Sequence, residues 1–330
     1  METPHSNGAV IGVDLGGTKL MAGLFDGSDT LIQRIRVEVG GLDQDQLVDA
    51  LAQTVAQLLD HTEEPVVAAG FGVPTTIDQR TGIAVQAANL PIANLPLRDI
   101  LHERTKLPVF LDNDANVAAL AEQRKGVGAG VADDLIMVTL GTGFGGGIVV
   151  DGRIMAGSIG AGAELGHVSI QHDGLPCISP NCPGVGCIET YASGSALARE
   201  AQALVEREPG GALARAVADG SEARGETVLR LAKAGDASCL AIFHEMGERL
   251  GTAFYGLVNI FNPQMIAVGG GMSPALELLL PIATEIVRKR ALAPGNEFVQ
   301  IVPAAFGPDA GMVGAALMAR DGVRSAALRA

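Results

Sequence analysis

The sequence twice places an apolar strand, a glycine-rich turn and a return strand in succession, once near the start of each half. The first copy runs through residues 10–25 with Gly16 and Gly17 at its turn, and the second through residues 135–150 with its glycines between 141 and 147. The apolar stretches are short and end at glycine, which predicts hairpins. The shared pattern therefore suggests duplicated halves, each opening with a hairpin.

Strands and helices alternate along the rest of the chain. The expected strands are residues 10–13, 19–25, 32–39, 66–73, 109–111, 135–140, 148–150 and 265–268. The expected helices are residues 47–60, 115–124, 246–261, one beginning at Ser273-Pro274 that Pro281 should break or kink, and 311–320. This alternation, with antiparallel hairpins opening each half, predicts an α/β fold with mixed sheets.

The length and charge of the chain limit its class. With 330 residues it is longer than one usual core, which predicts two domains or one domain interrupted by another. Asp and Glu outnumber Lys and Arg by 37 to 23, and the basic residues form no block. Nucleic acid and anionic membranes need a clustered positive field, so neither is expected as a partner.

The N-terminus and the cysteine content indicate a cytoplasmic protein. Residues 1–8 are polar and lack the order of a signal peptide, and no apolar run reaches membrane-spanning length. Four cysteines in a chain of this size do not indicate a secreted disulfide scaffold.

Three glycine turns leave the ends of apolar strands, and glycine there lets backbone N–H groups approach a phosphate without a Cβ in the way. The candidate nucleotide-binding residues are Asp14, Gly16, Gly17, Thr18 and Lys19, then Gly141, Thr142 and Gly143, then Gly270 and Gly271. Any one turn alone is more simply a tight hairpin. Three in one chain favour a nucleotide site. Because the first two open hairpins instead of helices, a dinucleotide-dependent dehydrogenase is disfavoured.

Asp14 comes at the end of a buried strand, directly before the first turn. A carboxylate in this position could hold Mg²⁺ beside the phosphates, or it could cap an Asx-type turn. Lys19 could contact a phosphate or face solvent as an ordinary strand residue.

Asn113 and Asp114 stand between an apolar strand and an Ala-rich helix. Both residue types favour helix N-caps, which is the structural interpretation. In the chemical interpretation, Asp114 is a general base that takes a hydroxyl proton while Asn113 orients the substrate. The local sequence does not decide between the two.

One histidine and three cysteines fall within twenty-one residues: His167, Cys177, Cys182 and Cys187. This set is typical of a closed tetrahedral zinc site that crosslinks loops without a core of their own, although the gaps between the cysteines are wider than in a zinc finger. Glu164 and Glu189 flank the cluster. Two rigidly held carboxylates could accept hydrogen bonds from neighbouring sugar hydroxyls, or they could be plain surface charges.

At these positions the sequence resembles the ROK family (repressors, open reading frames and kinases), specifically its glucokinase-type bacterial sugar kinases, over nearly the whole chain. The resemblance rests on two phosphate motifs, an adenosine motif, a catalytic stretch and a zinc and sugar signature. In that order these are residues 14–19, residues 140–147, residues 268–271, Asn113-Asp114-Ala115-Asn116, and Glu164-x-x-His167 with the three cysteines and Glu189.

The resemblance implies an actin-like ATPase (ribonuclease H-like) fold, with two α/β domains around a central cleft. Residues 1–115 with 309–330 would form the smaller domain, with the first phosphate motif. Residues 116–308 would form the larger domain, with the second phosphate motif, the zinc loop, the adenosine motif and a dimer surface. The implied activity is ATP-dependent phosphorylation of the 6-hydroxyl of glucose, with Mg²⁺, a structural Zn²⁺ and a homodimeric or tetrameric assembly.

The resemblance also implies the residue roles. Asp114 would deprotonate the primary hydroxyl of the sugar. The implied sugar ligands are Asn113, Asp114, Glu164, His167, Glu189 and, by analogy, Asn89. His167 would bind zinc through one ring nitrogen and face the sugar with the other.

Two departures from the family pattern affect these expectations. Three extra residues separate Cys177 from Cys182, and Pro183 stands where glycine is common, so we expect zinc with an altered loop. Asp112 replaces the glutamate that usually precedes Asn-Asp in the glucokinases of the family, which leaves the sugar preference less secure than the reaction.

Several alternatives stay open at this stage. The chain could phosphorylate N-acetylmannosamine, fructose or mannose, or it could be a non-catalytic sugar sensor. A DNA-binding repressor is disfavoured because about nine residues precede the first strand. Polyphosphate as donor would prefer a basic track, so ATP is favoured.

Overall fold

The computed structural model describes residues 8–87, 90–218 and 225–328. Asn89, one of the expected sugar ligands, lies outside the described residues. The chain divides into two compact units: Met1–Met137 with Gly147–Ala163 and Ala305–Ala330, and Val138–Gly146 with Glu164–Ala304. The domain boundaries that the family resemblance implies, 115/116 and 308/309, stay a prediction.

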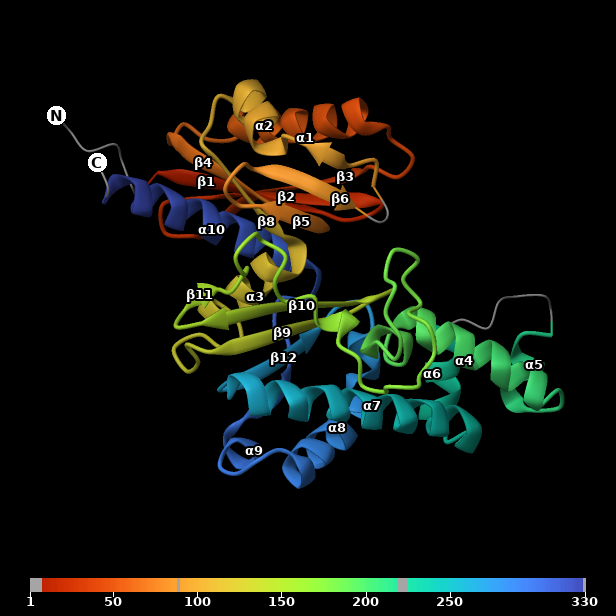
Figure 1. Ribbon diagram of the computed structural model, residues 1–330. Helices are drawn as coiled ribbons and strands as arrows, with labels where there is room; N and C mark the ends of the chain where they lie inside the picture. The colour runs from red at the N-terminus through yellow and green to blue at the C-terminus, as the bar shows by residue number, and fades with distance from the viewer. Residues whose placement is uncertain (1–7, 88–89, 219–224, 329–330) are drawn as a thin grey trace. The chain divides into compact units, whose positions relative to one another are not determined.

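The first five-stranded sheet has the strand order β3-β2-β1-β4-β8 (Figure 1). Its strands are β1 (Ala9–Leu15), β2 (Lys19–Phe25), β3 (Leu31–Glu38), β4 (Val66–Val73) and β8 (Val109–Asn113). Strand β1 pairs antiparallel with β2 and parallel with β4, which confirms the predicted mixed sheet. Strand β8 extends two residues beyond the predicted end and includes Asp112 and Asn113.

Helices cover both faces of this sheet (Figure 1). They are α1 (Gln44–Leu59) and α2 (Leu97–Thr105) on one face and α10 (Ala310–Ala327) on the other. Because side chains alternate along a strand, Ile11 of β1 belongs to the core that includes α1, whereas Val10 belongs to the core that includes α10. Gly12 lets α10 approach closely, since a Cβ there would lie 2.1 Å from the Met312 carbonyl oxygen.

The first unit contains two further elements, a small sheet and a helix. A small antiparallel sheet is formed by β5 (Thr75–Asp78), β6 (Ile83–Ala87) and β7 (Ala93–Leu95). Helix α3 (Asp114–Arg124) starts directly after β8. The bounds of α3 agree with the predicted helix 115–124 within one residue, whereas the small sheet was not predicted.

The second five-stranded sheet has the order β11-β10-β9-β12-β13. Its strands are β9 (Leu135–Leu140), β10 (Phe144–Val150), β11 (Arg153–Ile154), β12 (Met265–Gly269) and β13 (Gln300–Pro303). In each sheet the strand that opens the hairpin is central, with its hairpin partner on one side. This common order supports the inferred duplication.

The turn between β9 and β10 is shorter than predicted, because β10 already begins at Phe144. The glycines at 145–147 are strand residues, and two of them mark close approaches. A Cβ at Gly147 would lie 2.4 Å from the Ala115 carbonyl oxygen, and a Cβ at Gly146 would lie 2.4 Å from the Leu165 side chain. The glycines therefore serve packing as well as the turn.

The helices of the second unit are α4 (Gly194–Arg207), α5 (Ala212–Ala216), α6 (Gly225–Lys233), α7 (Ala237–Phe261), α8 (Leu276–Arg290) and α9 (Gly295–Phe298). Helix α8 continues through Pro281, so the predicted break does not occur, while the alternative, a kink, stays a prediction. A buried side of α8 packs against α7, where Gly247 and Gly251 lie against Ile282 and Ile286. This packing compensates for the one backbone hydrogen bond that proline cannot donate.

Helix α10 runs to Ala327, seven residues past the predicted end at Arg320. The Arg320 side chain is buried and donates to Asp29, to the Gly8 carbonyl oxygen and to the Asp26 carbonyl oxygen. These bonds hold the helix at the position where the sequence pattern suggested its end. In the described part of the chain, no helix has the length and apolar character that crossing a membrane requires.

Candidate active site

The first unit brings two distant carboxyl groups near one another. Asp14 lies on β1 and Asp114 begins α3. Gly72 of β4 stands close to both, since a Cβ there would lie 3.4 Å from Asp114 Cα and 3.7 Å from Asp14 Oδ1. Burial raises the pKa of Asp14 to about 7, the charge of Asp114 adds to this, and Lys19 opposes it. Near neutral pH the Asp14 carboxyl group therefore either holds a proton or is stabilised in its ionised form by a nearby cation such as Mg²⁺.

The start of α10 completes the surroundings of Asp14. A Cβ at Gly311 would lie 2.3 Å from Asp14 Cγ, so glycine leaves the room that the carboxyl group occupies. Gly311 was not predicted as a site residue from the sequence. The five Ala and Gly residues among positions 310–316 were the available signal, but such small residues are common in packed helices.

The first glycine turn is a tight hairpin. The Gly16 N–H donates to the Lys19 carbonyl oxygen at 2.8 Å, and the Thr18 carbonyl oxygen accepts from Val39 N at 2.8 Å. Gly17, Thr18 and Lys19 are exposed, so a ligand can reach the backbone of the turn. Lys19 opens β2 opposite Glu38 of β3 in the sheet register, and it is exposed, which favours the solvent-facing interpretation of its side chain.

Asn113 and Asp114 form the junction between β8 and α3. Asn113 is the N-cap, and its Oδ1 accepts from Ala115 N at 2.9 Å; Asp114 Oδ1 accepts from the same N–H at 2.9 Å. Asp112 is buried and its Oδ1 accepts from Asn113 N at 2.7 Å and from Asn116 Nδ2 at 2.8 Å. The capping interpretation is therefore confirmed for Asn113, and the same bonds orient Asp114.

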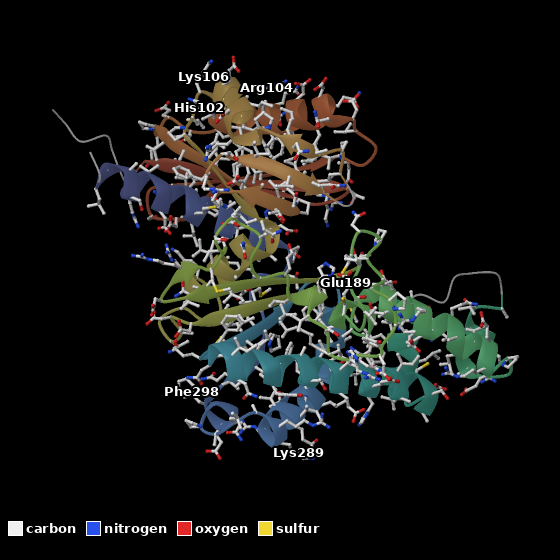
Figure 2. All side chains as sticks on the ribbon, viewed as in Figure 1. His102, Arg104, Lys106, Glu189, Lys289 and Phe298 are labelled. Atoms are coloured by element: carbon white, nitrogen blue, oxygen red, sulfur yellow. The ribbon has the colours of Figure 1, made fainter. Side chains whose placement is uncertain are left out.

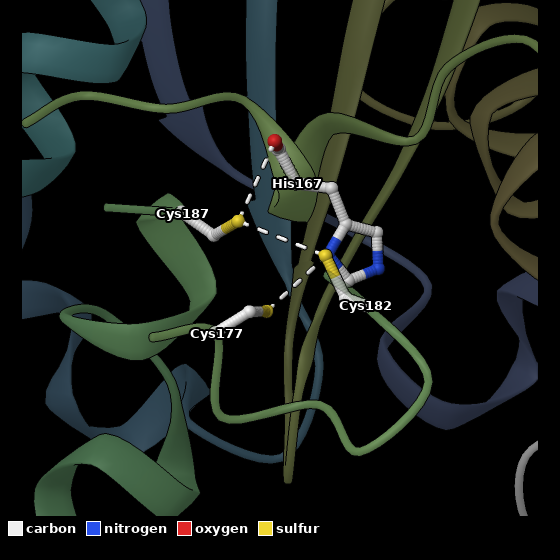
Figure 3. Close-up of side chains that lie close together, drawn as sticks. All are labelled: His167, Cys177, Cys182 and Cys187. Carbon is white, nitrogen blue, oxygen red and sulfur yellow. Dashed lines mark hydrogen bonds between the residues drawn. The ribbon is translucent and has the colours of Figure 1, made fainter. Parts of the chain in front are cut away.

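The second unit gathers the four predicted metal ligands (Figure 3). Their ligand atoms, one ring nitrogen of His167 and the Sγ atoms of Cys177, Cys182 and Cys187, all lie within 4.8 Å of one another. Cys177 Sγ is 3.6 Å from His167 Nδ1, and Cys182 Sγ is 3.9 Å from Cys187 Sγ. Zinc bonds of about 2.0–2.3 Å in a tetrahedron place ligand atoms roughly 3.5–3.8 Å apart. The set thus fits a tetrahedral metal ion despite the unusual cysteine spacing.

The two predicted sugar carboxylates have different surroundings. Glu189 (Figure 2) lies on the short 3₁₀ helix η2 (Ile188–Thr190), two residues after Cys187, and its Oε2 accepts from Phe144 N at 2.9 Å. Glu164 is exposed and precedes the 3₁₀ helix η1 (Leu165–His167), which ends at the predicted metal ligand His167. The structure therefore brings Glu189 to the second glycine turn, while Glu164 stays beside the cluster.

The second glycine turn is fixed by the start of α4. Gly194 N donates to the Gly141 carbonyl oxygen at 2.7 Å, and Ser195 donates to the Thr142 carbonyl oxygen through its N at 3.1 Å and its Oγ at 2.9 Å. Because the carbonyl oxygens of the turn are engaged in this way, its backbone position is well defined.

The third glycine turn lies against the end of β9. Gly270 has a φ of +94°, and a Cβ there would lie 2.5 Å from the Leu140 carbonyl oxygen, which accepts from Met272 N at 2.8 Å. Gly270 thus fills a packing position, whereas Gly271 faces the neighbouring pocket.

A pocket of about 810 Å³ adjoins the second and third turns. Its walls come from both turns and from α4, α6 and α7, and it is mainly apolar with charged groups at α6. The residues that bear on its chemistry are Gly141, Thr142, Ser195, Leu197, Leu229, Arg230, Lys233, Phe243, Gly271 and Met272. An apolar pocket of this size with a few polar groups can hold a small molecule such as a nucleoside.

The pocket residues on α4, α6 and α7 were not predicted from the sequence. They are ordinary members of amphipathic helices, and their spacing carries no signal beyond that of a helix with a buried face. The sequence-predicted residues fall into two sets. Asp14 to Lys19, Asn113 and Asp114 belong to the first unit, and the others that are described belong to the second.

Comparison with known proteins places these features in context. A family model described as ROK family matches residues 10–322. The chain is 35% identical over 312 residues to a glucokinase of Halalkalibacterium halodurans, covering 92% of each chain. It is also 31% identical over 291 residues to a xylose repressor of Caldicellulosiruptor bescii, covering 86% of this chain and 71% of the repressor.

A solved structure gives the same picture. The ROK family glucokinase from Streptomyces griseus, in complex with glucose and AMPPNP, superposes with a TM-score of 0.79 at 35% identity, covering 95% of this chain and 100% of that one. The relatives thus include sugar kinases as well as a repressor.

Proposed function

The chain belongs to the ROK family, and from this premise we propose that it is a glucokinase, which transfers the γ-phosphoryl group of Mg-ATP to the 6-hydroxyl of glucose. Its fold is the actin-like ATPase fold of the ROK sugar kinases. The observation that carries the proposal is the proximity of Asp14 and Asp114 in the first unit. Phosphoryl transfer to a hydroxyl needs a base and, close to it, a carboxylate that can hold the metal of the nucleotide.

Asp114 is the proposed general base. It accepts the proton of the 6-hydroxyl while that oxygen attacks the γ-phosphorus in line. The bond between the γ-phosphorus and the bridging oxygen of ADP breaks, so the products are glucose 6-phosphate, ADP and a proton carried away by Asp114. The hydrogen bond from Ala115 N holds one carboxylate oxygen in place during this step.

Asp14 is the proposed metal-holding residue of the first unit. Bound Mg²⁺ would offset the negative charge of the phosphates, and Asp14 would hold it directly or through water. The raised pKa of Asp14 supports this role, because a cation stabilises a carboxylate that is otherwise reluctant to ionise.

The second unit supplies the proposed nucleotide pocket. Gly141, Thr142 and Gly271 line the same pocket as the apolar side chains of α4, α6 and α7, which would take the adenosine. Backbone N–H groups of the glycine turns, including Gly16 to Thr18, would bind the phosphates. The AMPPNP complex of the Streptomyces griseus relative supports ATP as the donor.

The proposed sugar ligands are Asn113, Glu164, His167, Glu189 and Asn89. Carboxylate groups accept hydrogen bonds from vicinal hydroxyls, and amide groups can both accept from and donate to them. Zn²⁺ is the proposed ion of the His167 and cysteine cluster, and its role is to fix the loops that carry Glu164 and Glu189.

A coupled ADP-release assay with Mg-ATP tests the proposal. The sugars are glucose, mannose, fructose, N-acetylglucosamine and N-acetylmannosamine. For each sugar, a separate assay of the sugar phosphate product compares polyphosphate with ATP as the donor. We expect glucose to give the highest kcat/KM and ATP to be the donor. Preference for another hexose would keep the reaction and replace the substrate. Absence of sugar-dependent ADP release by zinc-loaded protein would contradict the proposal and favour a sugar sensor.

A further inference from the structure

The carboxylate of Glu189 is held against the second glycine turn. Its Oε2 accepts from Phe144 N at 2.9 Å, and the neighbouring residue, Gly143, leaves space for that oxygen. A Cβ added at Gly143 would lie 2.6 Å from Glu189 Oε2, which is well inside van der Waals contact. The absence of a side chain at Gly143 therefore permits the observed position of Glu189.

The turn itself does not require glycine at this position. Gly143 has no positive φ, so an alanine backbone is unstrained there. The atoms that a Cβ would meet belong to the Glu189 carboxyl group, the far end of a flexible side chain. The cheapest response to a methyl group at position 143 is thus a shift of the Glu189 carboxylate, which would break its bond to Phe144 N.

The turn is the fixed partner in this contact. Gly194 and Ser195 follow Glu189 in the chain by five and six residues. They donate hydrogen bonds to the carbonyl oxygens of Gly141 and Thr142. Because these backbone bonds hold the turn, the carboxylate adjusts to the turn and not the reverse.

We propose that Gly143 is a positioning residue for the sugar: it lets Phe144 N fix Glu189, so that the turn assigned to the nucleotide also sets the affinity for the hexose. This inference rests on the proposed function, because it takes Glu189 as a sugar ligand. It changes the role of Gly143, which acts through Glu189 and not through the phosphates.

The same contact couples the two substrates. A sugar hydroxyl and Phe144 N share one carboxylate, so binding of either partner reduces the freedom that the other must restrict. A nucleotide bound at the turn reduces the motion that remains to Phe144 N and the Glu189 carboxylate, so it strengthens sugar binding, and the sugar strengthens nucleotide binding by the same factor.

The test compares two alanine substitutions in the second unit. Gly143→Ala meets Glu189, whereas Gly256→Ala on α7 meets open space, since no heavy atom lies within 4 Å of the added Cβ. Glucose binding to nucleotide-free protein is measured by calorimetry. We expect Gly143→Ala to weaken it by about 10-fold or more, as for loss of an oriented charged acceptor, and Gly256→Ala by less than about 2-fold. Equal effects, or none, would overturn the proposal.

A double-mutant cycle shows whether the effect passes through Glu189. Glu189→Asp shortens the side chain by one methylene and makes room for the methyl group at position 143. In that background Gly143→Ala should have little further effect on glucose affinity, whereas an additive loss would contradict the proposal. Failure of Gly143→Ala to fold, seen in thermal melting, would also contradict it, because the proposal holds that Glu189 yields to the methyl group.

The coupling is measured separately with AMPPNP. In wild-type protein we expect glucose to raise the affinity for AMPPNP by about 5-fold or more, and Gly143→Ala to remove this factor while Gly256→Ala keeps it. Full coupling in Gly143→Ala would overturn the proposal. Failure of the proposed function is a different result: wild-type protein that turns over no glucose at all.

Discussion

The hairpins β1–β2 and β9–β10 share a place in their sheets but hold their carboxylates in different ways. In the first, Asp14 stands on the strand itself, and Gly72 and Gly311 leave room for it inside packed secondary structure. In the second, the carboxylate comes from Glu189, which reaches Phe144 from a loop segment beside the cysteine cluster. One site is held by a core and the other by loops.

Two copies of one topology can therefore lose stability and function in different ways. Loops with little core of their own open more easily than sheets and helices, and they depend on crosslinks such as a metal ion. We therefore expect damage in the first unit to affect the chemical step or the titration of the core. Damage to the loops beside the cysteine cluster should affect the affinity for the sugar and the local stability.

Asp114→Ala gives the largest expected effect. The variant should fold like the wild type and lose about 10²–10⁴-fold in kcat, because it removes the general base. Steady-state kinetics and thermal melting measure the two parts. Asp45→Ala is the matched control, since Asp45 also lies in the first turn of a helix, α1. A similar loss of kcat in both variants would contradict the general-base role and leave Asp114 with only the structural role of a residue in the first turn of a helix.

Cys187→Ser tests the loop-held side of the comparison. It should abolish zinc binding and lower the melting temperature by roughly 5 °C or more, because metal binding and loop folding are linked. Metal analysis and calorimetry provide the measurements. Cys239→Ser removes a buried cysteine on α7 outside the cluster and should keep the metal. Unchanged zinc content in Cys187→Ser would refute the ligand set.

Asp14→Asn sharpens the core-held side through pH. The folded state holds a proton on Asp14 up to about pH 7, whereas the ordinary pKa is 3.8. The folded state thus binds more protons between these values, so the stability from Asp14 is present below about pH 4 and is lost as pH rises through about 7. In metal-free protein, Asp14→Asn should gain stability relative to wild type over this range, by on the order of a few kcal/mol at most.

Urea denaturation at about pH 4.5 and about pH 8 measures this difference. Asp26 serves as a control, because its contribution to stability has the opposite pH dependence. Hydrogen bonds, first of all from the Ser28 hydroxyl, lower its pKa. Its contribution to stability is present above the ordinary pKa and is lost in acid. A pH-independent difference between wild type and Asp14→Asn would show that Asp14 is ionised throughout.

Arg249→Met should give the smallest effect. The Arg249 guanidinium lies 5.1 Å from the centre of the Tyr191 ring and donates to Gln171 Oε1 at 3.1 Å, so it braces the segment after Glu189 from α7. Loss of these contacts should raise the KM for glucose about 3-fold and leave the KM for ATP unchanged. Lys289→Met, which breaks an exposed ion pair with Glu285 on α8, is the control. Equal changes in both KM values would contradict a role specific to the sugar loop.

Much of the fold could be predicted from the sequence, because periodicity and glycine placement act locally. The strands at 19–25, 66–73 and 135–140 were predicted with the observed bounds. The break that was one alternative at Pro281 and the predicted end of α10 were wrong, since tertiary packing against α7 and the buried Arg320 outweighed local breakers. The small sheet β5–β7 was missed because its strands are short and weakly patterned.

The site was predictable where one segment carries the ligands and not where distant segments meet. The spacing of His167 and the cysteines indicated the metal cluster. No pattern could indicate that Phe144 N binds Glu189, 45 positions along the chain, or that Gly311 leaves room for Asp14. Such contacts depend on how the sheets and helices pack, which residue spacing does not encode.

The most direct test of the account follows the phosphate itself. Wild-type protein is incubated with Mg-ATP and glucose, and the products are identified by ³¹P NMR. The account predicts ADP and glucose 6-phosphate in equal amounts, with the phosphorus coupled to the protons on C6. ADP without a sugar phosphate, or a phosphate on another hydroxyl of glucose, would contradict it.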